Sequence, residues 1–179
     1  MQQLRSTTDE LMIRPEKAKD LQGVRSLLIA AFNEREDADL VERLRGSKDC
    51  YIDGLTLVAE VKGDVRGFAM LSRASLQFGE TMTDILALGP VAVLPAYQRT
   101  GIGSDLIRQA IKLADERGEK LIVVLGHEAY YPRFGFVPAS GFGIKPPQPW
   151  PDANYMARPL SAHNEPMQGT VVYPSEWNL

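Results

Sequence analysis

The strongest constraint on the fold is a helix-like segment that lies between two strand-like segments. Apolar side chains recur at helical spacing through residues 101–117, polar side chains fill the opposite face, and Gly118 follows. Residues 83–94 before it are apolar and β-branched, and residues 121–125 after it form a continuous apolar run. The short connections predict a β-α-β unit with two parallel strands and a right-handed crossover.

The remaining segments predict a sheet with further helices. Helical spacing of apolar side chains predicts helices over 18–33 and 37–46, and turn residues at 62–64 predict a hairpin. At Gly89-Pro90 we expect a bulge or an edge, because proline removes a hydrogen-bond donor. The strands are expected at 11–13, 55–61, 65–72, 83–94 and 121–125, with short edge strands at 154–157 and 170–173. This element order predicts an α/β or α+β fold with a mixed sheet.

Proline is distributed unevenly, since 7 of the 12 prolines follow Lys145. The first residues are polar and without pattern. We therefore expect a mobile leader over 1–10, a domain over 11–145, and a proline-rich extension over 146–179 that packs on this domain. A chain of 179 residues is long enough to bury a hydrophobic core without disulfide bonds.

Charge and cysteine usage exclude several classes of function. A net charge of -3 argues against a protein that binds nucleic acid or a membrane surface through basic side chains. The single cysteine, Cys50, excludes an internal disulfide framework, and with only His127 and His163 we expect no metal site. A signal-peptide core and a membrane-spanning run are both missing from the sequence, which predicts a cytoplasmic protein.

A glycine-containing segment, residues 98–104, lies between a predicted strand and the start of the 101–117 helix. Glycine lets backbone N–H groups approach a ligand, and the first N–H groups of a helix lack partners and lie at the positive end of its dipole. The segment therefore predicts a site for phosphate oxygens. A Rossmann fingerprint is excluded by Leu106 at its third glycine position, and a Walker loop by the absence of Gly-Lys-Ser/Thr. Alternatively, Gly101 and Gly103 only shape a tight turn.

The residues around this segment resemble a known family. The run 91–103 is similar to the acetyl-CoA signature of the Gcn5-related N-acetyltransferase (GNAT) superfamily: a strand, a loop with proline, then Gln/Arg-x-x-Gly-x-Gly/Ala at a helix start. Residues 130–136 match aromatic-Tyr-x-x-x-Gly-Phe after the next strand, and 125–139 resemble the YhbS-like predicted acetyltransferases of bacteria. The resemblance implies a mixed, mostly antiparallel sheet of roughly six to seven strands flanked by roughly four helices.

The resemblance also implies a donor and a donor site. Acetyl-CoA is the expected acyl donor, with no metal. Its pantetheine arm would pair with the backbone of Val91 and Val93 in the gap that the strand bulge opens. Its pyrophosphate would lie on Gln98, Arg99, Thr100, Gly101, Ile102, Gly103 and Ser104.

Three residues are candidates for catalysis. Tyr131 matches the family's general-acid tyrosine; the alternative is a core aromatic that packs beside Phe134 and Phe136. Asp84, in a β-rich run, and His127, which directly follows the next strand, are candidates for the base, although a lone histidine is often structural.

Together these features predict an N-acyltransferase that moves an acetyl group directly from acetyl-CoA to a primary amine. The alternative is a non-catalytic CoA-binding sensor or interaction module. The expected partner is a small-molecule or peptide amine rather than nucleic acid or membrane, and the resemblance admits a homodimer because relatives are often dimers.

Overall fold

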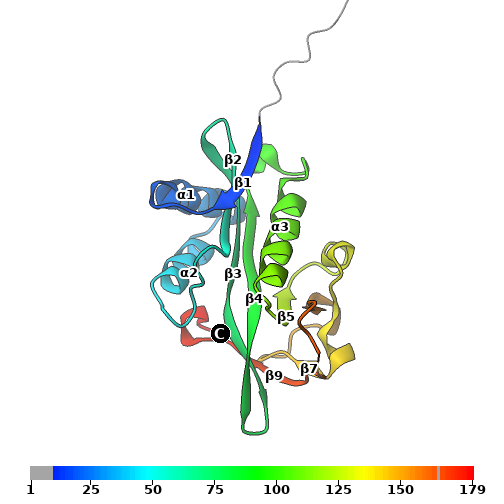
Figure 1. The fold of residues 1–179 in the computed structure, drawn as a ribbon. Coiled ribbons are helices and arrows are strands. Elements are labelled where there is room, and N and C mark those ends of the chain that lie inside the picture. Colours follow the sequence, from blue (N-terminus) through cyan, green and yellow to red (C-terminus); the bar gives the residue numbers. More distant parts are fainter. Residues whose placement is uncertain (1–9, 165) are drawn as a thin grey trace, which may run out of the picture.

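A mixed β-sheet forms the centre of the molecule in a computed structural model that describes residues 10–164 and 166–179 (Figure 1). The predicted leader over 1–10 lies outside the described residues apart from Glu10. Within them the sheet has nine strands in the order β1-β2-β3-β4-β5-β8-β6, with β7 and β9 off this path. The strands are β1 (Leu11–Pro15), β2 (Thr56–Val61), β3 (Asp64–Phe78), β4 (Thr81–Val93), β5 (Leu121–Leu125), β6 (Val137–Pro138), β7 (Ile144–Lys145), β8 (Tyr155–Pro159) and β9 (Gly169–Val172). Among the described residues, only the β4/β5 and β7/β9 pairs are parallel.

Helices cover both faces of this sheet. The α-helices of the described residues are α1 (Leu21–Phe32), α2 (Glu36–Arg45) and α3 (Ile102–Glu116). The 3-10 segments are η1 (Ala18–Asp20), η2 (Pro95–Tyr97), η3 (Tyr131–Phe134), η4 (Ala139–Phe142), η5 (Asp152–Asn154) and η6 (Ser175–Trp177). The fold class is confirmed, with more strands and one fewer α-helix than expected. Two of the additional strands, β6 and β7, are only two residues long.

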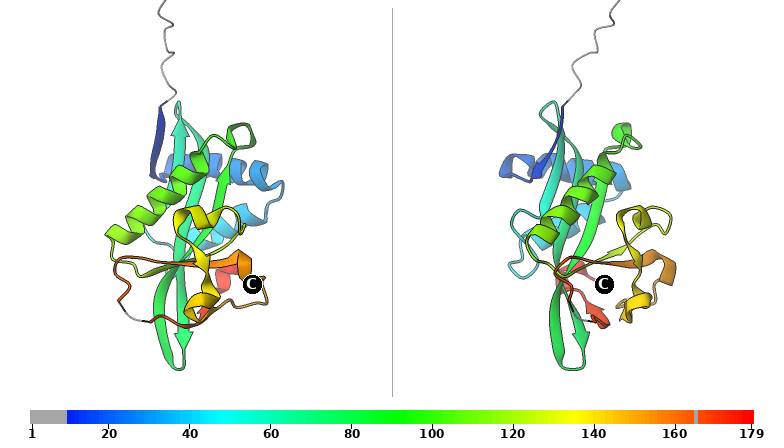
Figure 2. Two further views of the ribbon diagram at one scale, coloured as in Figure 1. Left: turned by 90° about the vertical axis from the view of Figure 1, so that its right-hand side faces the viewer. Right: turned by 45° about the vertical axis from the view of Figure 1, so that its right-hand side comes forward.

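Helices lie on both faces of the sheet (Figures 1 and 2), and each face carries its own hydrophobic layer. Helix α3 lies on one face, where Leu106 and Ile107 are buried against Leu57, Leu71 and Leu86. Helices α1 and α2 lie on the other face, where Leu28 and Leu44 pack against Val58 and Phe68. Because side chains alternate between the faces of a strand, β2 and β3 contribute to both layers.

Strand β4 has the predicted bulge. Leu88 lies opposite Leu71, and Val91 lies opposite Ala69. Gly89 and Pro90 therefore both lie opposite Met70, the single residue between Ala69 and Leu71. On its other side, β4 pairs with β5 only at Leu86 with Ile122 and at Ala87 with Val123. Beyond Ala87 the two parallel strands part.

The C-terminal segment belongs to the same sheet. Strand β8 pairs antiparallel with β5 along its whole length, and β6 pairs with the other side of β8. The expected edge strand at 154–157 is therefore an interior strand, a correction that arises because Val137–Pro138 covers its outer edge. Strand β9 pairs with β3 and β7, near the predicted 170–173.

A cluster of three charged side chains fastens β1 to the sheet. Arg14 donates to both carboxylate oxygens of Asp20 at 2.7 and 2.9 Å, and its Nε donates to Glu60 on β2 at 3.0 Å. The Asp20 carboxylate also accepts the Lys17 backbone N–H at 2.7 Å, and the residue is only 4% exposed. The hydrogen bond from Arg14 holds the pKa of Asp20 below its usual value.

We expect Asp20→Asn to lower the free energy of unfolding at pH 7 by about 3 kcal/mol, because it leaves the Arg14 guanidinium without its main partner. The lowered pKa of Asp20 adds stability above the unfolded value of about 3.9, and this stability is lost as the pH falls through the folded pKa. Urea unfolding between pH 7 and pH 2 measures both effects. The matched control is Asp39→Asn, whose side chain is 48% exposed beside Arg25 and should change stability by less than about 1 kcal/mol. Equal losses for the two variants would contradict this account.

Candidate functional site

A cavity of about 850 Å³ opens where β4 and β5 part. Its walls come from the end of β4, the start of α3 and the segment that follows β5. The lining residues are Phe32, Val91, Ala92, Val93, Gln98, Arg99, Gly101, Gly103, Ser104, Gly126, His127, Tyr130, Tyr131 and Arg133. Lining residues from three separate parts of the sequence, Phe32, 91–104 and 126–133, therefore meet at one hollow.

The loop before α3 presents the N-terminus of the helix to this cavity. Positive φ angles of 62° at Arg99 and 93° at Gly101 turn the chain into the helix. No side chain caps the first turn, so its N–H groups remain available, and the helix dipole adds positive potential there. Two side-chain bonds hold the loop: Thr100 Oγ1 donates to the Tyr97 carbonyl at 2.5 Å, and Gln98 Nε2 donates to the Val93 carbonyl at 3.1 Å.

Most of the residues expected at the donor site meet at this cavity. Val91, Val93, Gln98, Arg99, Gly101, Gly103 and Ser104 line it. Two do not: Ile102 is 5% exposed and packs in the core beneath α3, and the Thr100 hydroxyl is directed to the loop backbone. Their side chains hold the loop and the helix in place.

Tyr131 lines the cavity and also packs in an aromatic cluster. Its ring meets those of Tyr130, Phe134 and Phe136 edge-on, with centroids 5.3, 6.4 and 5.8 Å apart. Burial raises the pKa of its phenol to about 12, and the neighbouring Tyr130 adds to the shift. The hydroxyl therefore keeps its proton at neutral pH.

The ring of Tyr131 lies against the backbone of Gly126, the residue after β5. A Cβ at position 126 would fall 2.2 Å from Tyr131 Cε2, so no residue with a side chain fits without a shift. Asn154 holds this backbone from the other side: its carbonyl accepts the Gly126 N–H at 2.9 Å, and its Nδ2 donates to the Gly126 carbonyl at 3.1 Å. Asn154 and Gly126 thus set the position of Tyr131.

The two candidate bases lie in different places. His127 is exposed and lines the cavity, and its carbonyl accepts the backbone N–H groups of Tyr130 and Tyr131. Asp84 is exposed on β4 and does not line the cavity. It lies in the field of Arg73, which binds Glu119 just beyond the C-terminal end of α3. The cavity is at the opposite end of that helix, so Asp84 and Tyr131 are not brought together.

Sequence reasoning did not assign a role to five lining residues: Phe32, Ala92, Gly126, Tyr130 and Arg133. Gly126 carries a readable signal, because a glycine directly after a buried strand often allows a close approach. Phe32 carries none, since it belongs to the apolar stripe of α1 and reaches the cavity only through the packing of α1 on the sheet.

Two searches of the described residues gave negative results. None of their helices is long and apolar enough to cross a membrane. Across residues 10–164 and 166–179, no group of three or more His, Cys, Asp or Glu side chains could hold a metal ion.

Comparisons of sequence identify relatives of this chain. Residues 12–139 match the family model described as an acetyltransferase (GNAT) domain. The N-acetyltransferase YjhQ of Escherichia coli is 34% identical over 157 residues, which cover 85% of this chain and 86% of that protein. The N-acetyltransferase YhbS of the same organism is 30% identical over 126 residues, which cover 70% and 73% of the two chains.

Comparisons of structure agree. The Escherichia coli YhbS crystal structure, a complex with CoA, superposes with a TM-score of 0.86 at 28% identity over 97% of this chain and 94% of that one. A GNAT acetyltransferase from Brucella melitensis, a complex with acetyl-CoA, superposes with a TM-score of 0.76 at 29% identity over 94% and 99% of the chains. Because the family model, the full-length relatives and the fold all agree, the chain belongs to the GNAT family of acetyltransferases.

Proposed function

We propose that the protein transfers an acetyl group from acetyl-CoA directly to a primary amine. The observation that carries this proposal is the cavity between the parted strands, which joins an uncapped helix N-terminus to a half-buried, protonated tyrosine. The two solved relatives described above, which cover nearly all of the chain, are complexes with CoA and with acetyl-CoA.

We infer the direction of the donor in the cavity from the helix N-terminus. Its pyrophosphate accepts hydrogen bonds from the N–H groups at the start of α3, beside Gly101, Gly103 and Ser104, with Gln98 and Arg99 at the edge. Its pantetheine arm lies between β4 and β5, along the backbone of Val91 and Val93. This places the thioester beyond the pyrophosphate site, deeper in the gap between the strands.

The reaction needs an acid and a base. The neutral amine nitrogen attacks the thioester carbonyl and a C–N bond forms. The C–S bond breaks as CoA leaves with a proton from Tyr131, and the extra proton on the nitrogen returns to the Tyr131 phenolate. The raised pKa of Tyr131 keeps that proton available. His127 lines the cavity, and we assign its imidazole to take up the proton that the substrate ammonium group loses before the attack.

The acceptor that we propose is a primary amine on a small molecule or a peptide. The reaction needs a compartment that holds acetyl-CoA, in agreement with the cytoplasmic location predicted from composition. A homodimer remains a prediction from the resemblance.

We expect CoA to bind and Gly103→Leu to weaken its binding at least about tenfold. A Cβ at position 103 already lies 3.2 Å from the Tyr130 hydroxyl and 3.5 Å from Val93, so a longer side chain must enter the cavity. Isothermal titration measures both affinities. The proposal fails if the unchanged protein does not bind CoA at about 1 mM. Binding without thiol release in the presence of a panel of amines would instead indicate a CoA sensor.

Tyr131→Phe should lower kcat about a hundredfold or more, while the affinity for CoA changes less than twofold. The variant keeps the ring packing and removes only the proton donor. Since the pKa of Tyr131 is raised to about 12, its ionisation should cause no loss of kcat in the unchanged enzyme up to about pH 10. Steady-state kinetics from pH 6 to pH 10 test this, with Tyr51→Phe, a half-buried tyrosine in the α1–α2 layer, as control. Unchanged turnover of the Tyr131 variant would remove the acid assignment.

Gly126→Ala should displace the Tyr131 ring, and it should lower the free energy of unfolding by about 1–3 kcal/mol because the new methyl group overlaps the ring. Gly141→Ala is the matched control, since nothing lies within 4 Å of a Cβ at that position. Chemical denaturation compares the two variants, and kcat should fall only in the first. Equal stability of both variants would mean that the ring is not held against Gly126.

A further inference from the structure

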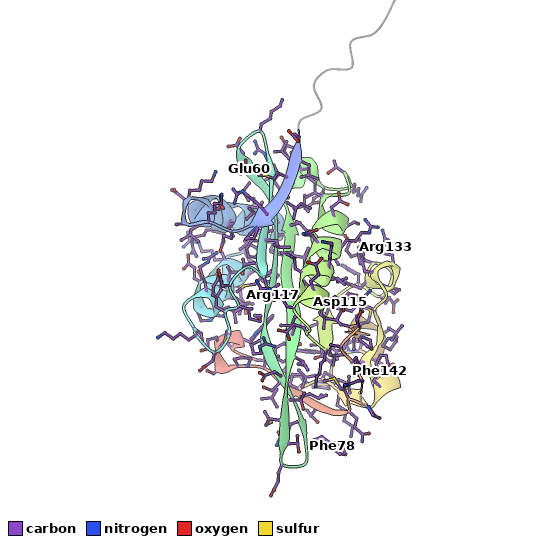
Figure 3. All side chains as sticks on the ribbon, in the orientation of Figure 1. Glu60, Phe78, Asp115, Arg117, Arg133 and Phe142 are labelled. Atoms are coloured by element: carbon purple, nitrogen blue, oxygen red, sulfur yellow. The ribbon has the colours of Figure 1, made fainter. Side chains whose placement is uncertain are left out.

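A second hollow, of about 510 Å³, lies beside the cavity along the outer face of α3. Its lining includes four cationic side chains, Arg108, Lys112, Arg133 and Arg158, and a single carboxylate, Asp115. Arg133 lines both hollows, so the two are adjacent at this residue. Figure 3 shows Arg133 on the segment next to α3, with Asp115 on the helix itself. We call this second hollow the basic groove.

Most of the charges in the basic groove already have partners. Asp115 accepts the Ser161 backbone N–H at 2.7 Å and the Ser161 hydroxyl at 2.9 Å, which lower the pKa of its carboxyl. Lys112 pairs with Glu116 at 2.8 Å, and Arg158 Nε donates to the Phe134 carbonyl at 2.7 Å.

The two remaining arginines have weak partners. Arg108 is 3.5 Å from Asp105, in a pair whose side chains are both at least half exposed. Arg133 donates one long hydrogen bond, at 3.4 Å, to the Ala129 carbonyl. These two guanidinium groups are therefore free to bind an anion at little cost in lost interactions.

Aromatic rings hold both guanidinium groups in place. Arg133 lies over the ring of Tyr130 at 4.6 Å from its centroid, and Arg108 lies over that of Phe134 at 5.3 Å. The centroids of the Tyr130 and Phe134 rings lie 5.2 Å apart in an edge-to-face contact. The two arginines therefore lie over neighbouring rings of one aromatic cluster. A guanidinium that stacks by its face keeps its N–H edge free, and this edge matches the oxygens of a phosphate.

The basic groove begins one helical turn from the proposed pyrophosphate site. Ser104 and Arg108 are four residues apart and share one face of α3, which separates them by about 6 Å along the axis. The Ser104 hydroxyl lies 3.3 Å from that of Tyr130, and both residues line the cavity. A ligand with its pyrophosphate at the helix N-terminus can thus reach Arg108 and Arg133 with its next group.

We propose that Arg108 and Arg133 bind the 3′-phosphate of CoA, so that the protein selects CoA over dephospho-CoA. This inference rests on the proposed function and goes beyond it, because the pyrophosphate and pantetheine sites work equally well for both molecules. The 3′-phosphate is a monoester with close to two negative charges at neutral pH and three acceptor oxygens. In a chain with a net charge of -3, two weakly partnered arginines, Arg133 at the edge of the cavity and Arg108 one helical turn from Ser104, form a local site for it.

Titration calorimetry with CoA and with dephospho-CoA at the same salt concentration tests the proposal. We expect the unchanged protein to bind CoA about tenfold or more tightly than dephospho-CoA. Arg108→Gln and Arg133→Gln should each reduce this preference at least about threefold by weakening CoA binding, with dephospho-CoA affinity changed less than twofold. Arg117→Gln, at the far end of α3, removes the same charge outside the basic groove and should keep the preference.

The outcomes separate this inference from the proposed function. Equal affinity of the unchanged protein for the two molecules would overturn the 3′-phosphate site and leave CoA binding intact. An equal loss of both ligands in the arginine variants would also overturn it, because the arginines would then act on a part of the ligand that both molecules share. Binding of neither ligand by the unchanged protein would overturn the proposed function, and this inference with it. Thermal melting of each variant checks that the fold is retained.

Discussion

The parting of β4 from β5 is the constraint on which the site depends. Two parallel strands that stayed paired to their ends would satisfy each other's backbone groups and leave no gap. Here the bulge at Gly89-Pro90 follows directly on the last β4/β5 pair, at Ala87 and Val123. Past that point β4 follows β3 alone, and its other edge faces the cavity. The strand end, the start of α3 and the segment after β5 can therefore all border one hollow.

The electrostatics of the site are local. The chain as a whole is mildly acidic, yet the cavity combines an uncapped helix N-terminus with Arg99 and Arg133, and none of its lining residues is acidic. Binding an anion through backbone N–H groups requires no side chain to lose conformational freedom. Arg108 and Arg133 already lie over aromatic rings, which restrict their side chains before a ligand binds. Positive potential is thus supplied by fixed groups rather than by an excess of basic residues.

The elements with strong periodicity could be predicted from the sequence. The three α-helices, the parallel β4/β5 pair and the bulge all follow from apolar spacing and from glycine and proline positions. Tyr131 and most of residues 98–104, to which the resemblance to the GNAT family assigned roles, line one cavity. These features are local, so each is determined by residues close in the chain.

Features that depend on distant packing could not be predicted. Asp84 lies in the same strand as Val91, but seven residues of extended chain span about 23 Å, which places it at the other end of the sheet. Arg108 has the pattern of a solvated helix face, and only the approach of η3 makes it part of a groove. Strand β8 is short and flanked by prolines, so nothing local indicates an interior position.

The Asn154–Gly126 contact has a consequence for the limits of the catalytic unit. The family model matches residues 12–139, whereas Asn154 and β8 lie beyond it. A fragment cut at residue 139 would keep residues 98–104 and Tyr131. It would lose the Asn154 side chain, which binds the Gly126 carbonyl, and strand β8, which pairs with β5. The smallest unit able to hold Tyr131 against Gly126 in this way therefore extends well into the proline-rich segment.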